Sequence, residues 1–218
     1  MLASSFEFEY SASAGVTLDF SYNNGNFFKE LDGFRLGSGF SFSVLLSLGR
    51  NDRIDNNILT SISSMIETGY NYYERERLSD EYYYYQYDYH SIILGYLLKL
   101  NFHNKVSLGI GAGIYIPLYG TEKEFYGMGG DSKSMEKLNQ KNIAFMHKIP
   151  FMPYVKLNVV RYFYLSDRWA FKIGGSLTYN FGMEFDTVKL ADYFVYDKYN
   201  FSSLNIEVYA GFSFGRPK

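Results

Sequence analysis

The chain contains no cysteine, four prolines and a single tryptophan among its 218 residues. Without cysteine the protein cannot form disulfides, use thiol catalysis or hold zinc through thiolates. A net charge of -2 argues against the basic surface of a general nucleic-acid binder, so we expect no nucleic-acid partner. The longest strongly apolar stretch, Ser91–Leu98, is far shorter than the ~20 residues of a membrane-spanning helix. Hydrophobic residues still make up 47% of the chain, which is too many for a disordered protein.

The feature that the sequence does have is a long alternation of apolar and polar residues. From Phe6 to Tyr22 every even position is apolar, and every odd position is polar or glycine. Successive side chains of a β-strand point to opposite faces, whereas the period of a helix would scramble this pattern. The segment is therefore predicted to be a strand with two unlike faces.

Seven further segments show the same alternation, and no change of composition marks a domain boundary. The eight predicted strands cover 6–22, 34–48, 58–72, 82–101, 106–119, 148–164, 169–186 and 202–214. Connections at one end cover 23–33, 74–81, 120–147 and 187–201, and those at the other end cover 49–57, 102–105 and 165–168. We predict a single all-β domain, 1–218, folded as an eight-stranded antiparallel up-and-down barrel.

Residue size indicates which face of the barrel points inward. The polar face consists of glycine, serine, threonine and asparagine with scattered charges, and the apolar face is bulky. Eight strands leave an interior just wide enough for side chains, which suits the small face. The strands at 6–22 and 169–186 carry aromatic residues at both ends of an aliphatic centre, as the girdles of membrane barrels do. The sequence therefore predicts a transmembrane barrel with lipid against its apolar face.

This organisation resembles the small bacterial outer-membrane β-barrel superfamily, which includes the OmpA transmembrane domain, OmpX and the PorT-like barrels. The resemblance covers the whole chain and includes a last strand that ends on Phe212 and Phe214, like the assembly signal of such barrels. The chain departs from that signal at Gly211 and in the four residues that follow Phe214. The resemblance implies a Gram-negative outer-membrane location and contact with outer-membrane lipid. Since Met1 leads directly into polar residues, we expect an exported protein whose signal peptide is absent from this chain.

Charged residues on the polar face are predicted to form a network that plugs the lumen. Six acidic and five basic side chains nearly balance, and charges inside a narrow barrel should pair. The predicted network comprises Glu7, Glu9, Asp19, Arg35, Glu67, Lys99, Lys148, Lys156, Lys172, Glu184 and Glu207. The alternative is a narrow passive pore.

A tyrosine-rich hairpin is the strongest candidate for binding a partner. Its tyrosines flank the charged segment 74–77 and occupy both faces of the predicted strands. Tyrosine provides rigid, amphipathic contact area. The predicted partner-binding residues are Tyr72, Tyr73, Tyr82, Tyr83, Tyr84, Tyr85, Tyr87 and Tyr89. Other outer-membrane or cell-surface proteins, such as subunits of an outer-membrane complex, are the candidate partners; cross-strand stabilisation of the hairpin is the structural alternative.

The sequence gives little support for an enzyme. His90 and His147 both fall near the end with the long loops, and Asp88 and Ser91 are close to His90 in sequence. An outer-membrane enzyme acting on lipid or peptide is therefore the remaining alternative, although no spacing fixes a catalytic set. The segment 127–134 lacks the glycine that a phosphate-binding loop needs directly before its lysine. We predict a non-enzymatic barrel with no catalytic residues, no metal site and no cofactor.

Overall fold

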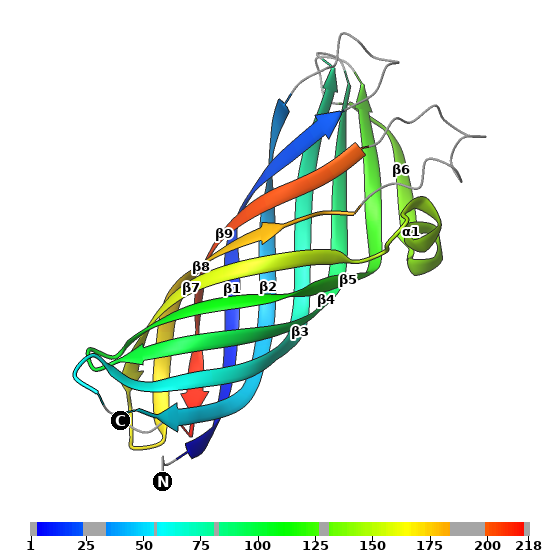
Figure 1. Ribbon diagram of the computed structural model, residues 1–218. Coiled ribbons are helices and arrows are strands. Elements are labelled where there is room, and N and C mark those ends of the chain that lie inside the picture. Colours follow the sequence, from blue (N-terminus) through cyan, green and yellow to red (C-terminus); the bar gives the residue numbers. More distant parts are fainter. Residues whose placement is uncertain are drawn as a thin grey trace.

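The computed structural model describes residues 4–23, 34–54, 56–80, 83–126, 131–183 and 199–215. These residues form nine strands and one short helix (Figure 1). The elements are β1 (Ser4–Asn23), β2 (Phe34–Arg53), β3 (Leu59–Asp80), β4 (Tyr83–Phe102), β5 (Val106–Tyr126), β6 (Asp131–Asn139), α1 (Gln140–Met146), β7 (Met152–Tyr164), β8 (Trp169–Asn180) and β9 (Tyr199–Phe214). Among the described residues, no helix is long and apolar enough to cross a membrane.

Eight of these strands close into a ring. The order is β4-β3-β2-β1-β9-β8-β7-β5, and the pairing of β4 with β5 completes the circle. Every neighbouring pair is antiparallel, and β1 joins the two ends of the chain by pairing with both β2 and β9. The predicted eight-stranded antiparallel barrel is confirmed. We call the end with the short turns, where both termini lie, the lower end (Figure 1).

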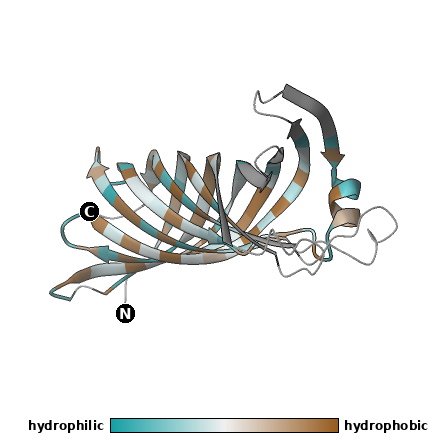
Figure 2. Cartoon of the chain, turned by 90° about the horizontal axis from the view of Figure 1, so that it is seen from above, coloured by the Kyte–Doolittle hydropathy of each residue, from teal (hydrophilic) through white to brown (hydrophobic). Residues whose placement is uncertain are grey.

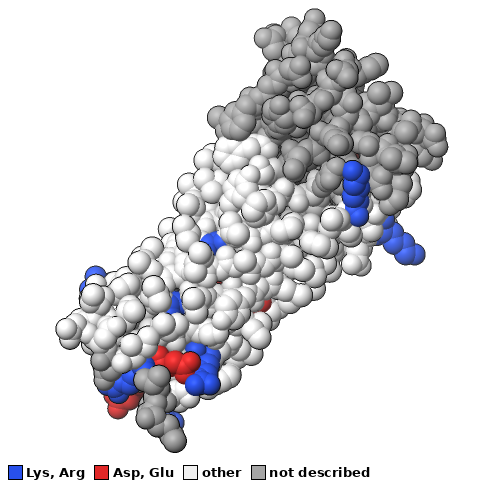
Figure 3. Space-filling model, viewed as in Figure 1, with Lys and Arg blue, Asp and Glu red and all other residues white. Residues whose placement is uncertain are grey.

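The barrel is apolar outside and polar inside, as the alternation predicts. Along β1, the Phe6 and Val16 side chains are 67% and 55% exposed, whereas Glu7 and Thr17 are fully buried. Figure 2 shows the same alternation of apolar and polar segments along the other strands. On the face seen in Figure 3, charged side chains gather near the two ends, and the wall between them is almost free of charge. This distribution is the reverse of that in a water-soluble protein and fits a lipid surface.

One strand lies outside the ring. The lower part of β5, Val106–Tyr115, pairs with β7, and its upper part, Tyr119–Tyr126, pairs with β6. The residues of β6 and α1 fall in the connection predicted at 120–147, because mixed charges there hide any apolar face. The predicted sixth strand, 148–164, begins later, at Met152.

Strand β3 is longer than predicted at the upper end, whereas β4 begins at Tyr83, next to the predicted start at 82. The two strands pair up to Asp80 and Tyr83, so the charged segment 74–77 belongs to β3 rather than to the loop predicted at 74–81. The register of β4 against β5 shifts between His90 and Ser91, where Leu118 of β5 has no partner. This β-bulge places one extra residue on β5 between the two pairs. The outcome is a wall that is taller along β1–β5 than along β7 and β8 (Figure 1).

Candidate functional site: the barrel interior and the aromatic rim

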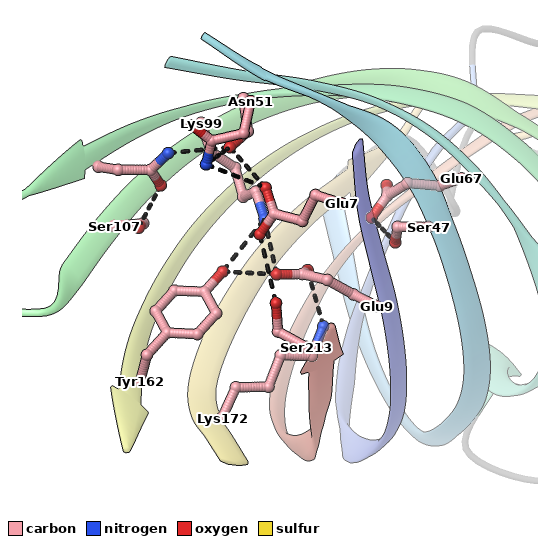
Figure 4. Close-up of polar contacts among 12 residues, drawn as sticks. Glu7, Glu9, Ser47, Asn51, Glu67, Lys99, Ser107, Tyr162, Lys172 and Ser213 are labelled. Atoms are coloured by element: carbon pink, nitrogen blue, oxygen red, sulfur yellow. Dashed lines mark hydrogen bonds and ion pairs between the residues drawn. The ribbon is translucent and has the colours of Figure 1, made fainter. Parts of the chain in front are cut away.

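The lower part of the interior contains a group of ion pairs. The Glu9 carboxylate accepts hydrogen bonds from Lys99 Nζ at 2.7 Å, Lys172 Nζ at 2.9 Å and the Tyr162 hydroxyl at 2.7 Å. Lys99 also lies 3.3 Å from Glu7, and all five side chains are buried. We call these residues, Glu7, Glu9, Lys99, Tyr162 and Lys172, the lower charge network (Figure 4). Because the network is shielded from water, each charge needs an opposite charge or several hydrogen bonds.

The remaining oxygens of this network are satisfied by small polar side chains. The Ser63 hydroxyl donates to Glu7 at 2.7 Å, and Ser213 does so at 3.3 Å. Asn51 and Asn101 both donate to the Ser63 hydroxyl, which connects the carboxylates to β2 and β4. The serines and asparagines of the inner face therefore act as hydrogen-bond partners and leave room for the long charged side chains.

Two further carboxylates lie near mid-height. Glu67 forms an ion pair with Lys156 and accepts a hydrogen bond from Ser47 at 3.5 Å. Glu207 accepts hydrogen bonds only from serine hydroxyls and forms no ion pair within the described residues. The two carboxylates therefore have different surroundings, although both point into the same interior.

The upper interior is aromatic. A buried cluster contains Tyr73, Tyr87, Tyr89, Ile93, Tyr115, Leu138, Ile143, Met152, Tyr154 and Met183. We call it the upper aromatic cluster. The Tyr73 hydroxyl donates to Asp19 at 2.9 Å and lies 3.0 Å from the Ser203 hydroxyl. Leu138 of β6 and Ile143 of α1 belong to this cluster, so the segment outside the ring is attached to the barrel through its apolar side chains.

The predicted lumen residues fall into three groups. The buried, inward-pointing ones are Glu7, Glu9, Asp19, Glu67, Lys99, Lys156, Lys172 and Glu207. Lys148 is exposed and precedes β7, so its predicted place in the lumen is wrong, because β7 begins only at Met152. Arg35 lies in β2, but its side chain is outside the described part of the structure, as is all of Glu184. Among the described residues the lumen therefore holds five carboxylates and three lysines, rather than a balanced set.

The predicted partner-binding tyrosines are divided between the two faces of the wall. Tyr73, Tyr87 and Tyr89 point inward and are buried, so for these three a role as a partner surface is wrong. Tyr72 lies on the outer face and is half-buried. Tyr82 and the side chains of Tyr83, Tyr84 and Tyr85 lie outside the described residues. The sequence could not separate these groups, since both faces of the hairpin are aromatic.

A smaller aromatic group covers the outer face of the upper wall. The His90 ring stacks on Tyr119 with a centroid distance of 4.0 Å, lies 5.1 Å from the Tyr72 ring, and shares a short hydrogen bond with the Tyr70 hydroxyl. We call Tyr70, Tyr72, His90 and Tyr119 the outer aromatic patch. It joins neighbouring positions of β3, β4 and β5.

The residues considered for an enzyme do not assemble into a catalytic set around His90. The His90 side chain lies on the outer face of β4, whereas the buried Ser91 points inward. The Asp88 carboxylate is bonded to the backbone N–H of Thr121 at 3.0 Å and to its hydroxyl. His147 Nδ1 bonds the carbonyl of Ile143 at 2.9 Å. Among the described residues, no group of three histidine or acidic side chains could hold a metal ion.

Glycines of the inner face make room for long side chains that lie flat against the wall, a role that the sequence analysis missed. A Cβ atom on Gly95 would be 2.2 Å from the Tyr154 hydroxyl, and one on Gly113 would be 2.6 Å from it. Likewise, a Cβ atom on Gly109 would be 2.0 Å from Oδ1 of Asn158. The run of glycines at every second position of β5, opposite large residues of β7, is the signal that could have revealed this packing.

The side chains exposed on the outer surface indicate that the barrel spans a membrane. Aliphatic side chains such as Ile66, Ile110 and Leu157 are exposed along the middle of the wall, and Trp169 and Phe212 are exposed near the lower end. An apolar band bounded by aromatic residues, around a closed ring of strands, is suited to a bilayer. Lipid tails contact the apolar side chains, and the closed ring provides hydrogen-bond partners for the backbone N–H and C=O groups. The protein is a transmembrane β-barrel. Its apolar wall is in contact with lipid.

Comparisons with known proteins give similarities of architecture at low sequence identity. No family model and no curated protein matches the sequence. The attachment invasion locus protein Ail of Yersinia pestis, in complex with a heparin analogue, is 15% identical, with 95% of this chain and 99% of that chain covered and a TM-score of 0.38. OprG of Pseudomonas aeruginosa is 10% identical, with 100% and 98% covered and a TM-score of 0.43. The outer membrane protease OmpT of Escherichia coli is 8% identical, with 97% of each chain covered and a TM-score of 0.42.

Proposed function

We propose that this protein is a non-enzymatic outer-membrane barrel with a closed lumen, which carries a binding surface on the upper part of its wall. The observation that supports the proposal most directly is that buried side chains gather at two heights of the interior, in the lower charge network and in the upper aromatic cluster. Since an eight-stranded barrel has only enough room for its own side chains, two such layers would leave no continuous path for water.

Electrical recordings test the closed lumen. Purified protein in planar lipid bilayers should give no steady, ohmic single-channel current. A variant of the same length with Lys99→Ala and Tyr162→Ala should also remain closed, because the upper aromatic cluster is still present. Steady current from the unmodified protein, abolished by a reagent that blocks the lumen, would show instead that the barrel is a narrow passive pore.

The outer aromatic patch is the surface that we propose for partner binding. Tyr119 is 50% exposed, and Tyr70, Tyr72 and His90 are half-buried beside it. Flat aromatic groups give a large contact area at little cost in side-chain entropy. Lys137 and Lys141 are exposed on β6 and α1, which continue the wall beside β5. We propose that another outer-membrane or cell-surface protein, such as a subunit of an outer-membrane complex, binds there.

Site-specific photocrosslinking in native membranes tests this surface. A photoreactive amino acid at Tyr119 should give adducts with a discrete protein. The matched control is Leu177, which lies on the outer face of β8 and is 40% exposed, and it should give adducts with lipid alone. If both positions crosslink only to lipid, the patch belongs to the aromatic girdle at the membrane interface and the proposal fails.

A further inference from the structure

Arg161 is a positive charge on a wall that is otherwise uncharged. Its side chain is exposed on the outer face of β7, beside Val106 of β5 and Ile173 of β8. No other charged side chain of the described residues points outward from β7, β8, β9 or the lower part of β5. Hydrocarbon does not solvate a charge, so the guanidinium must reach water or a polar group that lies outside this wall.

The arginine lies just above the aromatic girdle of the lower end. Phe163 follows it on the same face of β7 and pairs with Phe171 of β8, which in turn pairs with Phe212 of β9. The guanidinium carbon is 5.6 Å from the centroid of the Phe163 ring, so the side chain extends toward the girdle rather than toward the bilayer centre. Aromatic girdles mark the level of the lipid headgroups, and a long basic side chain can place its charge there. The guanidinium is therefore within reach of the headgroups.

The surroundings of Arg161 favour a negatively charged ligand. The arginine makes no ion pair with any described residue. The turn before β5 lies beside it, because the backbone N–H of Tyr162 donates to the carbonyl of Lys105 at 2.9 Å. With the turn after β7, this corner of the barrel holds Arg161, Lys105 and Arg168 against one acidic residue, Asp167. A guanidinium presents planar N–H donors that match the oxygens of a phosphate.

We propose that Arg161 binds the phosphate of an anionic phospholipid, such as phosphatidylglycerol, in the leaflet at the lower end of the barrel. The acyl chains then lie against the exposed side chains of Leu108, Val159 and Ile173, which continue the wall toward the bilayer centre. The excess of basic residues at this corner favours a headgroup with a net negative charge over a zwitterionic one. The site is at the opposite end of the barrel from the outer aromatic patch, so it does not depend on the binding function proposed above.

The single tryptophan of the chain can report which lipid occupies this corner. Trp169 is 51% exposed on the outer face of β8, and its carbonyl accepts a hydrogen bond at 2.9 Å from Leu165, which directly follows β7. Bromine atoms on an acyl chain quench tryptophan fluorescence at short range. The protein is reconstituted in phosphatidylcholine vesicles with a minor fraction of phosphatidylglycerol, and the bromine is placed either on the phosphatidylglycerol or on an equal amount of the phosphatidylcholine. Bromine on phosphatidylglycerol should quench Trp169 several times more strongly.

Two variants separate a site at Arg161 from a general attraction. Arg161→Gln removes a charge from the lipid-facing wall, so the barrel should fold, and the two labels should then quench Trp169 equally. The matched control is Arg50→Gln, also exposed on the outer face near the lower end, where Arg50 already pairs with Asp52; it should keep the full preference. Three outcomes overturn the site: equal quenching by the two labels in the unmodified protein, a preference that survives in Arg161→Gln, or equal losses of preference in the two variants. The last of these would mean that the total charge of the lower end attracts the lipid.

Discussion

The lower and upper parts of the barrel share one alternating pattern but have interiors of opposite chemistry. In the lower part all eight strands surround the bore, and its inner face is made of glycine, serine, asparagine and paired charges. In the upper part a buried cluster of tyrosine, leucine, isoleucine and methionine dominates, with the polar Asp19 and Ser203 bonded to Tyr73. Strands β1–β5 run through both parts in the same order, so the arrangement of these strands does not explain why the two interiors differ.

The height of the opposite wall explains the contrast. The last pair between β5 and β7 is Tyr115 with Met152, and β5 continues beyond it to Tyr126. Below this level, strands face one another across a narrow bore, so long polar side chains reach a partner on the far side. Above it, the tall wall is covered by residues of β6 and α1, which bury their apolar side chains against it. Four substitutions test this comparison, from the largest expected effect to the smallest.

The largest effect is expected from Lys99→Met in the lower charge network. Lys99 lies between Glu7 and Glu9, and its loss leaves two buried carboxylates with too little positive charge. Removing one partner of a buried ion pair costs about 3–5 kcal/mol. Urea unfolding in lipid vesicles should show a loss of this size, whereas Lys141→Met, at an exposed position of α1, should change little. If Lys99→Met lowered the unfolding free energy no more than Lys141→Met, the lower charge network would not be stabilising the barrel.

Leu177→Arg on the lipid face should have the next largest effect. Leu177 lies near the middle of β8 and points outward, so a charge there enters the apolar centre of the bilayer. The expected cost is about 2–4 kcal/mol, decreasing to about 0–1 kcal/mol at an interfacial position such as Trp169, apart from lost ring packing against Phe214. Unfolding in vesicles measures both. Equal losses of unfolding free energy at the two positions would contradict the placement of Leu177 at the bilayer centre and Trp169 at its interface.

Gly95→Ala should have a moderate effect at the boundary between the two parts. A Cβ atom at Gly95 would lie 2.2 Å from the Tyr154 hydroxyl, so the ring must shift and the barrel loses about 1–3 kcal/mol. Tyr154→Phe removes the obstructing oxygen, and that oxygen has no hydrogen-bond partner to lose within the described structure. The double variant should therefore recover most of the stability. If Tyr154→Phe gives no recovery, the glycine is required for another reason.

The smallest effect on the barrel is expected from Ile143→Ala in α1. Ile143 is 1% exposed and packs in the upper aromatic cluster, but α1 and β6 lie outside the ring of eight strands. The unfolding free energy of the barrel should change by less than about 1 kcal/mol, since local segments can open without the rest. Limited proteolysis should cut the α1 segment faster in this variant. A large loss of barrel stability with no faster cleavage would show that α1 is part of the cooperative core.

Local patterns were sufficient for predicting the ring but not its contents. The predicted strand 6–22 corresponds to β1, Ser4–Asn23, because alternation is a property of neighbouring residues. The partners inside the ring depend on the register between distant strands. Lys99 meets Glu9 across 90 residues of sequence, and Glu207 meets serines of β1, β2 and β8, although alternation says only that all of them point inward.

The sequence by itself determined the strands, their inward and outward faces and the transmembrane barrel, because period-two alternation and residue size are encoded locally. Only the tertiary structure decided that Tyr73, Tyr87 and Tyr89 point inward, because both faces of their hairpin are aromatic. It alone placed Lys148 outside the lumen and β6 outside the ring, because these follow from the residue at which β7 begins. The height and angular position of a side chain around a barrel are set by strand register, which no single segment of the sequence contains.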